Sequence, residues 1–506
     1  MSQTVRAPSD RSLRARLADA LGARFGVDTR ALAALRISLG LLLLADLLLR
    51  ARHLRALYTD SGLAPRAVLA GQYPAVRYSI HALSGAAWFQ ALLFVLAGLL
   101  AASLLAGYRT RTSTVLSLIL LVSLHLRNPA ALTGGDTLLR RLLLWGMLLP
   151  LGERWSLDAR RREGAPRRRL TSVAAAGLLS QVVLVYAVNA ALKHRGDLWL
   201  RGDAVRYVFS LQQFSLRLGD ALTAFPSLLR AFDWFWLGLV SLSPLLVLSR
   251  GRLRTALTLM FAAAHLGMLA TLRLGLFPLV SLAALLVFLP SPVWDRVETG
   301  VPASLERSAA RVGDRVRSVG TRVGAGVRRP PPTVSRSLST VRRAGRRLVP
   351  VVAAALLTFA LVWNTVALGA VPPPEEEPAG LDLTQSPWSM FAPTPATVDG
   401  WYVAPGELES GERVDAFYRS APLAGERPET RAMYPSVRWR KYLVDLRYSG
   451  DEARQRAFAS YLCERWNRAH EDDLASLTVS YVEQPTRLDG PESTRRVELL
   501  QHQCRG

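Results

Sequence analysis

Long apolar runs alternate with short polar segments along the first 370 residues of the chain. A membrane-crossing α-helix needs about 20 consecutive, mostly apolar residues. Runs near this length recur here with few charged residues inside them, which is typical of a polytopic membrane protein. We therefore expect an all-α membrane bundle of about nine transmembrane helices, at 31–49, 85–106, 112–126, 137–151, 170–192, 234–248, 255–272, 274–289 and 348–370.

The segment after the last apolar run has the pattern of a separate α+β domain. We expect paired strands at 399–403 and 412–417, around the turn at 405–406, and further strands at 477–482 and 496–500. Apolar residues every four positions predict a helix over 451–470. The predicted parts are a basic N-terminus (1–30), a membrane domain (31–295), an Arg-rich linker (296–347), a last transmembrane helix (348–370) and a C-terminal domain (371–506).

Charge gives the bundle an expected orientation. The chain has 63 Lys and Arg against 39 Asp and Glu. Loops on the cytoplasmic side of a membrane carry an excess of Lys and Arg. With nine spans, the basic segments fall on one side, at 1–30, 107–111, 152–169, 250–254 and 293–347. We expect a multi-pass protein of the cell membrane, with a cytoplasmic N-terminus, an extracytoplasmic C-terminal domain and the lipid bilayer, not nucleic acid, as partner.

The two cysteines, Cys463 and Cys504, both lie in the C-terminal domain. Two cysteines confined to a domain outside the membrane favour a disulfide. The alternative is a pair of buried thiols.

The most distinctive polar stretch follows the fifth apolar run. It holds Lys193, the one lysine of the membrane domain, with His194 next to it and Trp199 downstream. Asn189 lies one helical turn before Lys193. A buried lysine can lose its proton, unlike arginine. Lys193 and His194 are therefore candidates for a base or an anion anchor, and the alternative is a lysine that extends from a helix end to the interface.

Other ionisable groups lie at membrane depth. Asp136 and Arg140 are four residues apart, so they share a helix face and can pair, and His265 lies in the seventh run. Such groups normally face the bundle interior, where they line a site or pair with one another. His265 also fits a hydrogen-bonded core histidine. We find no sequence motif for a metal site, a P-loop or a Ser-His-Asp triad.

An ordered set of motifs over about residues 20–295 is similar to the HTTM domain, the membrane domain of the vitamin K-dependent gamma-carboxylase family. The motifs are Tyr58-Thr59-Asp60-Ser61-Gly62-Leu63-Ala64-Pro65-Arg66, Gly107-Tyr108-Arg109-Thr110-Arg111, Gly134-Gly135-Asp136 followed by Trp155-Ser156-Leu157-Asp158, and Ala190-Ala191-Leu192-Lys193 with Trp199 and Gly202.

The resemblance implies a membrane enzyme, but two departures bear on its reaction. Carboxylases of the family carry paired lysines where this chain has Lys193-His194, which places His194 at the position of their base. They also carry Asn-His in the loop that here reads Gly134-Gly135-Asp136, so their catalytic histidine is missing.

Two hypotheses follow. In the first, the chain is a membrane enzyme with an outward cavity near Lys193 and His194 that takes a lipid-soluble cofactor such as a quinone; Asp136, Arg140, Asn189, Trp199 and His265 are its candidate binding residues. In the second, the bundle is a non-catalytic scaffold or export-linked module that presents the C-terminal domain. A deep outward cavity lined by Lys193, Asp136 and Arg140 favours the first, and a bundle packed solid there favours the second.

Overall fold

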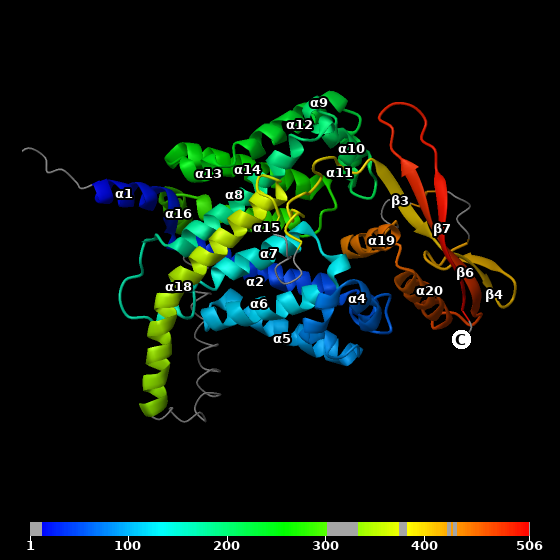
Figure 1. The fold of residues 1–506 in the computed structure, drawn as a ribbon, viewed down its shortest axis with the longest axis horizontal. Coiled ribbons are helices and arrows are strands. Elements are labelled where there is room, and N and C mark those ends of the chain that lie inside the picture. Colours follow the sequence, from blue (N-terminus) through cyan, green and yellow to red (C-terminus); the bar gives the residue numbers. More distant parts are fainter. Residues whose placement is uncertain (1–12, 301–331, 374–381, 422–426, 429–432, 505–506) are drawn as a thin grey trace, which may run out of the picture.

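The computed structural model describes residues 13–300, 332–373, 382–421, 427–428 and 433–504. Within them, a helical bundle carries a smaller α+β domain at one end (Figure 1). Much of the expected N-terminus and Arg-rich linker, at 1–12 and 301–331, lies outside the described residues. We call the C-terminal α+β part the outer domain.

Helices occupy all nine of the expected stretches. They are α2 (Thr29–Ala51), α5 (Ala87–Ala106), α6 (Thr110–Arg127), α7 (Gly134–Gly146), α8 (Val173–Lys193), α12 (Pro226–Ser241), α14 (Gly251–Thr271), α15 (Phe277–Leu285) and α18 (Pro332–Ala367). Shorter elements connect them: α1 (Leu13–Phe25), α3 (Leu54–Tyr58), α4 (Arg66–Gln72), η1 (Pro74–Tyr78), η2 (Ile80–Ala82), η3 (Pro129–Ala131), η4 (Ala159–Arg161), α9 (Asp197–Arg201), α10 (Ala204–Ser210), α11 (Arg217–Leu222), α13 (Leu245–Leu248), η5 (Leu286–Phe288) and α16 (Ser291–Gly300), with a two-stranded ribbon of β1 (Val27–Asp28) and β2 (Arg169–Leu170).

By length and composition alone, fewer helices qualify as membrane spans than the nine that the sequence predicts. In the described part of the chain, five helices are long and apolar enough to cross a bilayer: α2, α5, α8, α14 and the 347–367 part of α18. The bent pair formed by 277–288 and α16 raises this number to six at most. The other helices are shorter or richer in hydroxyl side chains; α12, for example, ends just before Pro244, which cannot continue a helix. The protein is therefore a mostly helical membrane protein, and nine spans are not confirmed.

The ends of the helices have clear sequence signals. Ser172 caps α8 by accepting a hydrogen bond from the Ala175 N–H, and Thr133 and Asp136 form a capping box at the start of α7. Gly107 ends α5 in the left-handed conformation, with φ of 69°. These signals fix where each helix starts and therefore which side chains reach the end that carries the outer domain.

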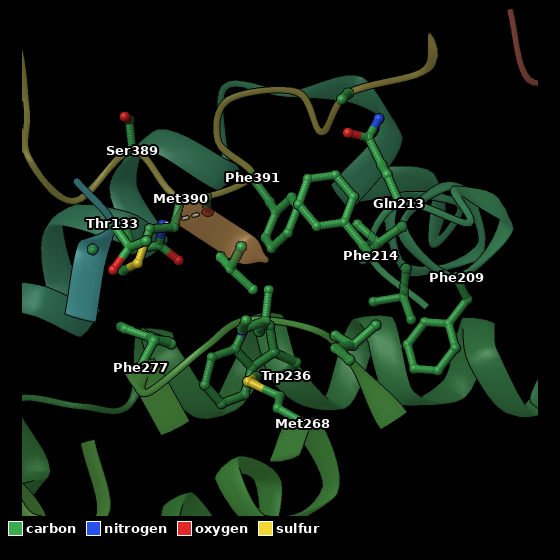
Figure 2. A pocket seen from close by; sticks show the side chains of 18 of the residues that line it. Thr133, Phe209, Gln213, Phe214, Trp236, Met268, Phe277, Ser389, Met390 and Phe391 are labelled. Atoms are coloured by element: carbon green, nitrogen blue, oxygen red, sulfur yellow. Dashed lines mark hydrogen bonds between the residues drawn. The ribbon is translucent and has the colours of Figure 1, made fainter. Parts of the chain in front are cut away.

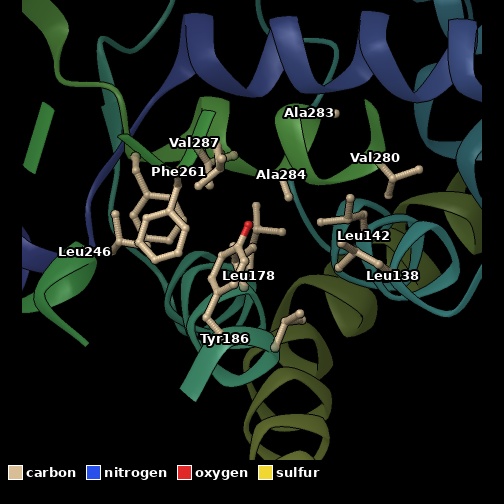
Figure 3. Close-up of a cluster of buried hydrophobic side chains, with 14 of the residues drawn as sticks. Leu138, Leu142, Leu178, Tyr186, Leu246, Phe261, Val280, Ala283, Ala284 and Val287 are labelled. Carbon is tan, nitrogen blue, oxygen red and sulfur yellow. The ribbon is translucent and has the colours of Figure 1, made fainter. Parts of the chain in front are cut away.

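One apolar core fills the centre of the bundle. Figure 3 shows side chains from α7, α8, α14 and α15 packed against one another, among them Leu138, Leu178, Phe261 and Val280. Burial of such side chains supplies most of the stability of a packed core, about 1.5–3 kcal/mol each against exposure to water. α2 packs along α5 and α15, and α18 packs along α8.

The outer domain is a five-stranded antiparallel sheet with two helices. Its elements are β3 (Val398–Val403), β4 (Pro405–Leu408), β5 (Arg413–Asp415), α19 (Val437–Ser449), α20 (Glu452–Asn467), β6 (Leu474–Pro485) and β7 (Arg495–Gln503). The long β6 pairs with β7 on one edge and with β3 and β4, one after the other, on its opposite edge.

The structure confirms some of the expectations for this domain and corrects others. The expected helix is α20, and the strands at 477–482 and 496–500 are β6 and β7. The expected pairing of 399–403 with 412–417 is wrong, because β3 pairs with β6 while β5 pairs with β4. Helix α19 was not expected. Cys463 and Cys504 form the expected disulfide, with their Cα atoms 5.5 Å apart.

The outer domain shares an apolar core with the bundle. Leu57, Tyr58 and Leu69 from the segment after α2 are buried in the same cluster as Trp401 and Trp439 of the outer domain. The Tyr442 hydroxyl also donates a hydrogen bond to the Leu63 carbonyl oxygen, at 2.7 Å. The outer domain therefore has a fixed position on the bundle.

Candidate functional site

A cavity of about 800 Å³ lies where the bundle meets the outer domain. Its walls come from α8, α10, α12, α14 and α15 of the bundle and from α19 of the outer domain. Most of the lining is apolar or aromatic. Figure 2 shows Phe214 and Phe391 on one side of the cavity, with Trp236 and Met268 on the opposite side. Its size and lining match those of pockets that bind small organic molecules, about 300–1,000 Å³ and mostly apolar.

Residues 386–391, which we call the strap, cover one side of the cavity. Side chains of the Lys193 region hold the backbone of the strap. The Asn189 amide donates to the carbonyl oxygens of Trp388 and Met390, at 2.8 and 3.0 Å, and the Trp199 indole N–H donates to that of Phe391, at 2.8 Å. The residues singled out in the sequence therefore meet a segment almost 200 positions further along the chain.

Lys193 lies at the end of α8 and lines the cavity, with a side chain that is 1% exposed. Its ammonium lies 3.4 Å from the Met390 carbonyl oxygen and 3.2 Å from the centre of the Trp199 ring. Among the described residues, this carbonyl is its one hydrogen-bond acceptor. An ammonium has three N–H donors, so Lys193 retains donors for another group in the cavity.

The outer domain contributes two further cations to the lining, Arg440 and Lys441 of α19. The Arg440 guanidinium lies 4.0 Å from the centre of the Phe214 ring and donates to the Gln213 carbonyl oxygen at 2.5 Å. Burial lowers the pKa of Arg440 to about 10. Both lysines of the chain therefore line one cavity, from different domains.

His194 does not line the cavity, so the expectation that Lys193 and His194 face one site together is not met. Its side chain is exposed, and its Nε2 lies 2.9 Å from the Ser241 hydroxyl oxygen. Adjacent residues of a helix point in different directions, so Lys193 and His194 cannot both face the same cavity from the end of α8. Lys193, Asn189 and Trp199 line the cavity as a group, and His194 lies outside it.

Asp136 belongs to a different cluster, which is buried beside the cavity. It accepts hydrogen bonds from Arg50 of α2 at 2.6 Å and from Arg438 of α19 at 2.8 Å. Asp46, the other carboxylate there, binds the same two guanidiniums, at 2.7 and 2.5 Å. The expected pair of Asp136 and Arg140 is not among the ion pairs of the described residues; Arg140 is half-buried and lies outside the cavity lining.

This cluster also has the donor set of a metal site. Ligand atoms of Asp46, His125 and Asp136 lie within 4.8 Å of one another. However, Arg50 and Arg438 already supply two positive charges to the two carboxylates. The arrangement therefore fits an ionic network between the domains better than a cation site.

His265 forms part of the wall behind the cavity. Its ring is buried between Tyr186, Trp236 and Phe277, with ring centres 5.8–5.9 Å away, and its Nδ1 lies 2.8 Å from the Phe261 carbonyl oxygen. His265 does not appear among the lining residues. This geometry matches the core-histidine alternative.

Gly134 and Gly135 pack tightly under the strap. A Cβ atom at Gly134 would lie 2.6 Å from the Met390 sulfur, and one at Gly135 would lie 3.0 Å from the backbone of Phe277. A larger side chain at Gly134 would displace the end of the Met390 side chain, and one at Gly135 would press against the backbone of α15.

Several contributors to the site were not found by sequence reasoning. The Lys193 region meets the strap, Gln213, Phe214 and Arg440 only through the tertiary fold. A partial signal was present, because Lys441 is the second of only two lysines in an arginine-rich chain.

Comparison with known proteins agrees with this membrane fold. Residues 26–294 match the HTTM domain. No curated protein and no solved structure matches the chain. The match covers more than half of the 506 residues, so the protein belongs to the HTTM domain family.

Proposed function

We propose that this protein binds a lipid-soluble small molecule, such as a quinone or a lipid, in the cavity under the strap, with Lys193 facing its polar end. The observation that carries the proposal is a buried ammonium with free donors in the wall of a large aromatic cavity. A charged donor buried without a full set of partners is costly, so a ligand that supplies acceptors is favoured there.

An enzymatic role would rest on the same residue. Lys193 can hold or accept a proton beside the bound molecule, and Asn189 and Trp199 orient the strap above it. We do not propose glutamate carboxylation, because the loop at 134–136 lacks the Asn-His pair that the resemblance leads us to expect of a carboxylase.

The second candidate is a scaffold that presents the outer domain. It is supported by the strong connection between the two parts: the shared apolar core and the ion pairs of Arg438 with Asp46 and Asp136. The cavity favours ligand binding, because a scaffold has no need of 800 Å³ of space at the interface.

Mass spectrometry of organic extracts from the purified protein tests the proposal. We expect a lipid-soluble molecule to be retained by the wild type and by His194→Ala, whose side chain lies outside the cavity. Lys193→Met and the cavity-filling change Val208→Trp should lose it. An extract that is the same for all four proteins would show background lipid and contradict the proposal.

We further propose nine spans, with the N-terminus in the cytoplasm and the outer domain outside. The Arg-rich segments gather near α1: Asp158 accepts hydrogen bonds from the Arg109 and Thr110 N–H groups, and Arg169 and Arg254 donate to carbonyl oxygens of α1. A disulfide in the outer domain fits an oxidising compartment.

Labelling of introduced cysteines in intact cells tests this topology. A membrane-impermeant maleimide should label Ser410→Cys in the outer domain and should leave Arg111→Cys unlabelled until the membrane is opened; both positions are exposed. Labelling of both positions from outside would contradict the topology.

A further inference from the structure

We infer that the molecule in this cavity is an amphiphile with an anionic head, and that the outer domain completes the site for that head. The inference rests on the proposed ligand-binding function and goes beyond it by naming the charge of the ligand. It follows from the charged groups that line the cavity and from the domains that supply them.

The lining carries positive charge without matching negative charge. Its charged side chains are Lys193, Arg440 and Lys441, and no Asp or Glu of the described residues lines the cavity. The chain as a whole has 39 acidic residues, so their exclusion from this lining sets the cavity apart from the rest of the protein. The field inside such a cavity favours an anion.

Two acidic side chains near the cavity lie behind its walls and are bonded to other protein groups. Asp233 accepts a hydrogen bond from the Val205 N–H at 2.9 Å. Asp399 accepts one from the Gln212 N–H at 2.9 Å and pairs with Arg427. Neither side chain lines the cavity. They offset part of the positive charge without offering a surface to a cationic ligand.

The hydrogen-bond donors that face the cavity are not all bonded to other groups of the described residues. Lys193 has one long hydrogen bond to the Met390 carbonyl oxygen. Lys441 has an exposed side chain and makes no hydrogen bond or ion pair within the described residues. A carboxylate or phosphate has enough acceptor oxygens to bind more than one such donor, and charge-assisted bonds of this kind are among the strongest.

The rest of the cavity fits a hydrocarbon or ring system. Phe209, Phe214, Trp236 and Phe391 contribute aromatic surface, and Met268 adds a flexible apolar side chain. A free inorganic anion would leave this surface without contacts. The site therefore combines apolar walls for a tail with cations from both domains for a head.

Quenching of tryptophan fluorescence by brominated lipids tests the inference in detergent micelles, because Trp199 and Trp236 line the cavity. Dibromostearic acid is compared with its methyl ester at a pH of about 8, where the acid is ionised. The ester has the same tail and no charge, so it measures quenching from the micelle and from the tail alone.

We expect the acid to bind at least about tenfold more tightly than the ester, since one charge-assisted hydrogen bond is worth about that factor. Lys193→Met and Lys441→Met should each weaken binding of the acid by about tenfold and leave the ester unchanged. Arg456→Met is the matched control, because Arg456 is an exposed cation of the outer domain that pairs with Glu452.

If the acid and the ester bind equally tightly, and neither lysine variant changes their affinity, the inference of an anionic head is contradicted. The cavity would still be a ligand site. Val208→Trp separates this result from failure of the proposed function. If both probes still quench as in the wild type after the cavity is filled, binding in the cavity itself is contradicted.

Competition distinguishes the two sources of the anion. Palmitate and hexadecyl phosphate carry a carboxylate and a phosphate on similar tails, and hexadecanol carries neither. Displacement of the bromo acid by either anion at lower concentration than hexadecanol supports the inference and identifies the head. Equal potency of hexadecanol would contradict it.

Discussion

At the scale of single residues, two sets of buried charges near the boundary between the bundle and the outer domain have different surroundings. Arg438, Arg50, Asp46 and Asp136 satisfy one another at distances of 2.5–2.8 Å. Lys193, in contrast, has one weak acceptor and an aromatic ring. The first group fits a structural role and the second group fits binding.

Arg438→Met tests the structural role of the first group. Removal of one partner from a buried ionic network leaves uncompensated charge and costs about 3–5 kcal/mol. We expect thermal unfolding of the outer domain in micelles to shift to lower temperature, with Arg456→Met close to the wild type. An Arg438→Met protein as stable as this control would show that the network contributes little.

Residue spacing alone gave part of the candidate site. It identified Lys193 as unusual, and Asn189 one helical turn earlier does share its surroundings. It missed the hydrogen-bonded partners of Asp136, because Arg50 and Arg438 come from other segments of the chain. Contacts between residues hundreds of positions apart depend on the tertiary fold, which periodicity cannot supply.

At the scale of elements, close contact between helices depends on small residues. Gly40 of α2 faces the backbone of α5: a Cβ atom there would lie 2.8 Å from the Leu105 Cα atom. Gly98 of α5 has no atom within 4 Å of such a Cβ. The pair therefore offers a matched comparison of a glycine that packs and one that does not.

Gly40→Ala should lower the midpoint of thermal unfolding in micelles, since overpacking against a backbone costs about 1–3 kcal/mol. Gly98→Ala should change the stability by less than about 1 kcal/mol. Equal effects of the two changes on the melting temperature would rule out close packing of α2 on α5.

Hydrophobic periodicity located every long helix but not the pairing of the strands. The apolar runs correspond to α2, α5, α8, α14 and α18 because helix formation is encoded locally. β3 pairs with β6, about 80 positions away, although β4 and β5 are much closer in the chain. α19 carries several Arg and Lys residues among its apolar ones, which obscures its apolar face in the sequence.

At the scale of the whole molecule, the outer domain and the bundle form one structural unit. They share an apolar core, an ionic network and the walls of the cavity. Changes that unfold the outer domain should therefore also alter the ligand site. The disulfide joins α20 to the residue that follows β7. Its removal should destabilise the outer domain without changing a residue of the cavity lining.

Replacement of Cys463 and Cys504 by Ser removes a cross-link between positions 41 residues apart. In the chain-entropy model this lowers the free energy of unfolding by about 4 kcal/mol. Urea unfolding of the outer domain should shift to lower concentration, and a reducing agent should produce the same shift in the wild type and none in the double variant. A wild type insensitive to reduction would contradict this stabilising role.

The most direct test of the central claim is an experimental density map of the protein in lipid nanodiscs by electron cryomicroscopy. We predict elongated density that does not belong to the protein in the cavity under the strap, with one end next to Lys193. A cavity filled by side chains, or a Lys193 side chain directed into the surrounding lipid or water, would contradict the account.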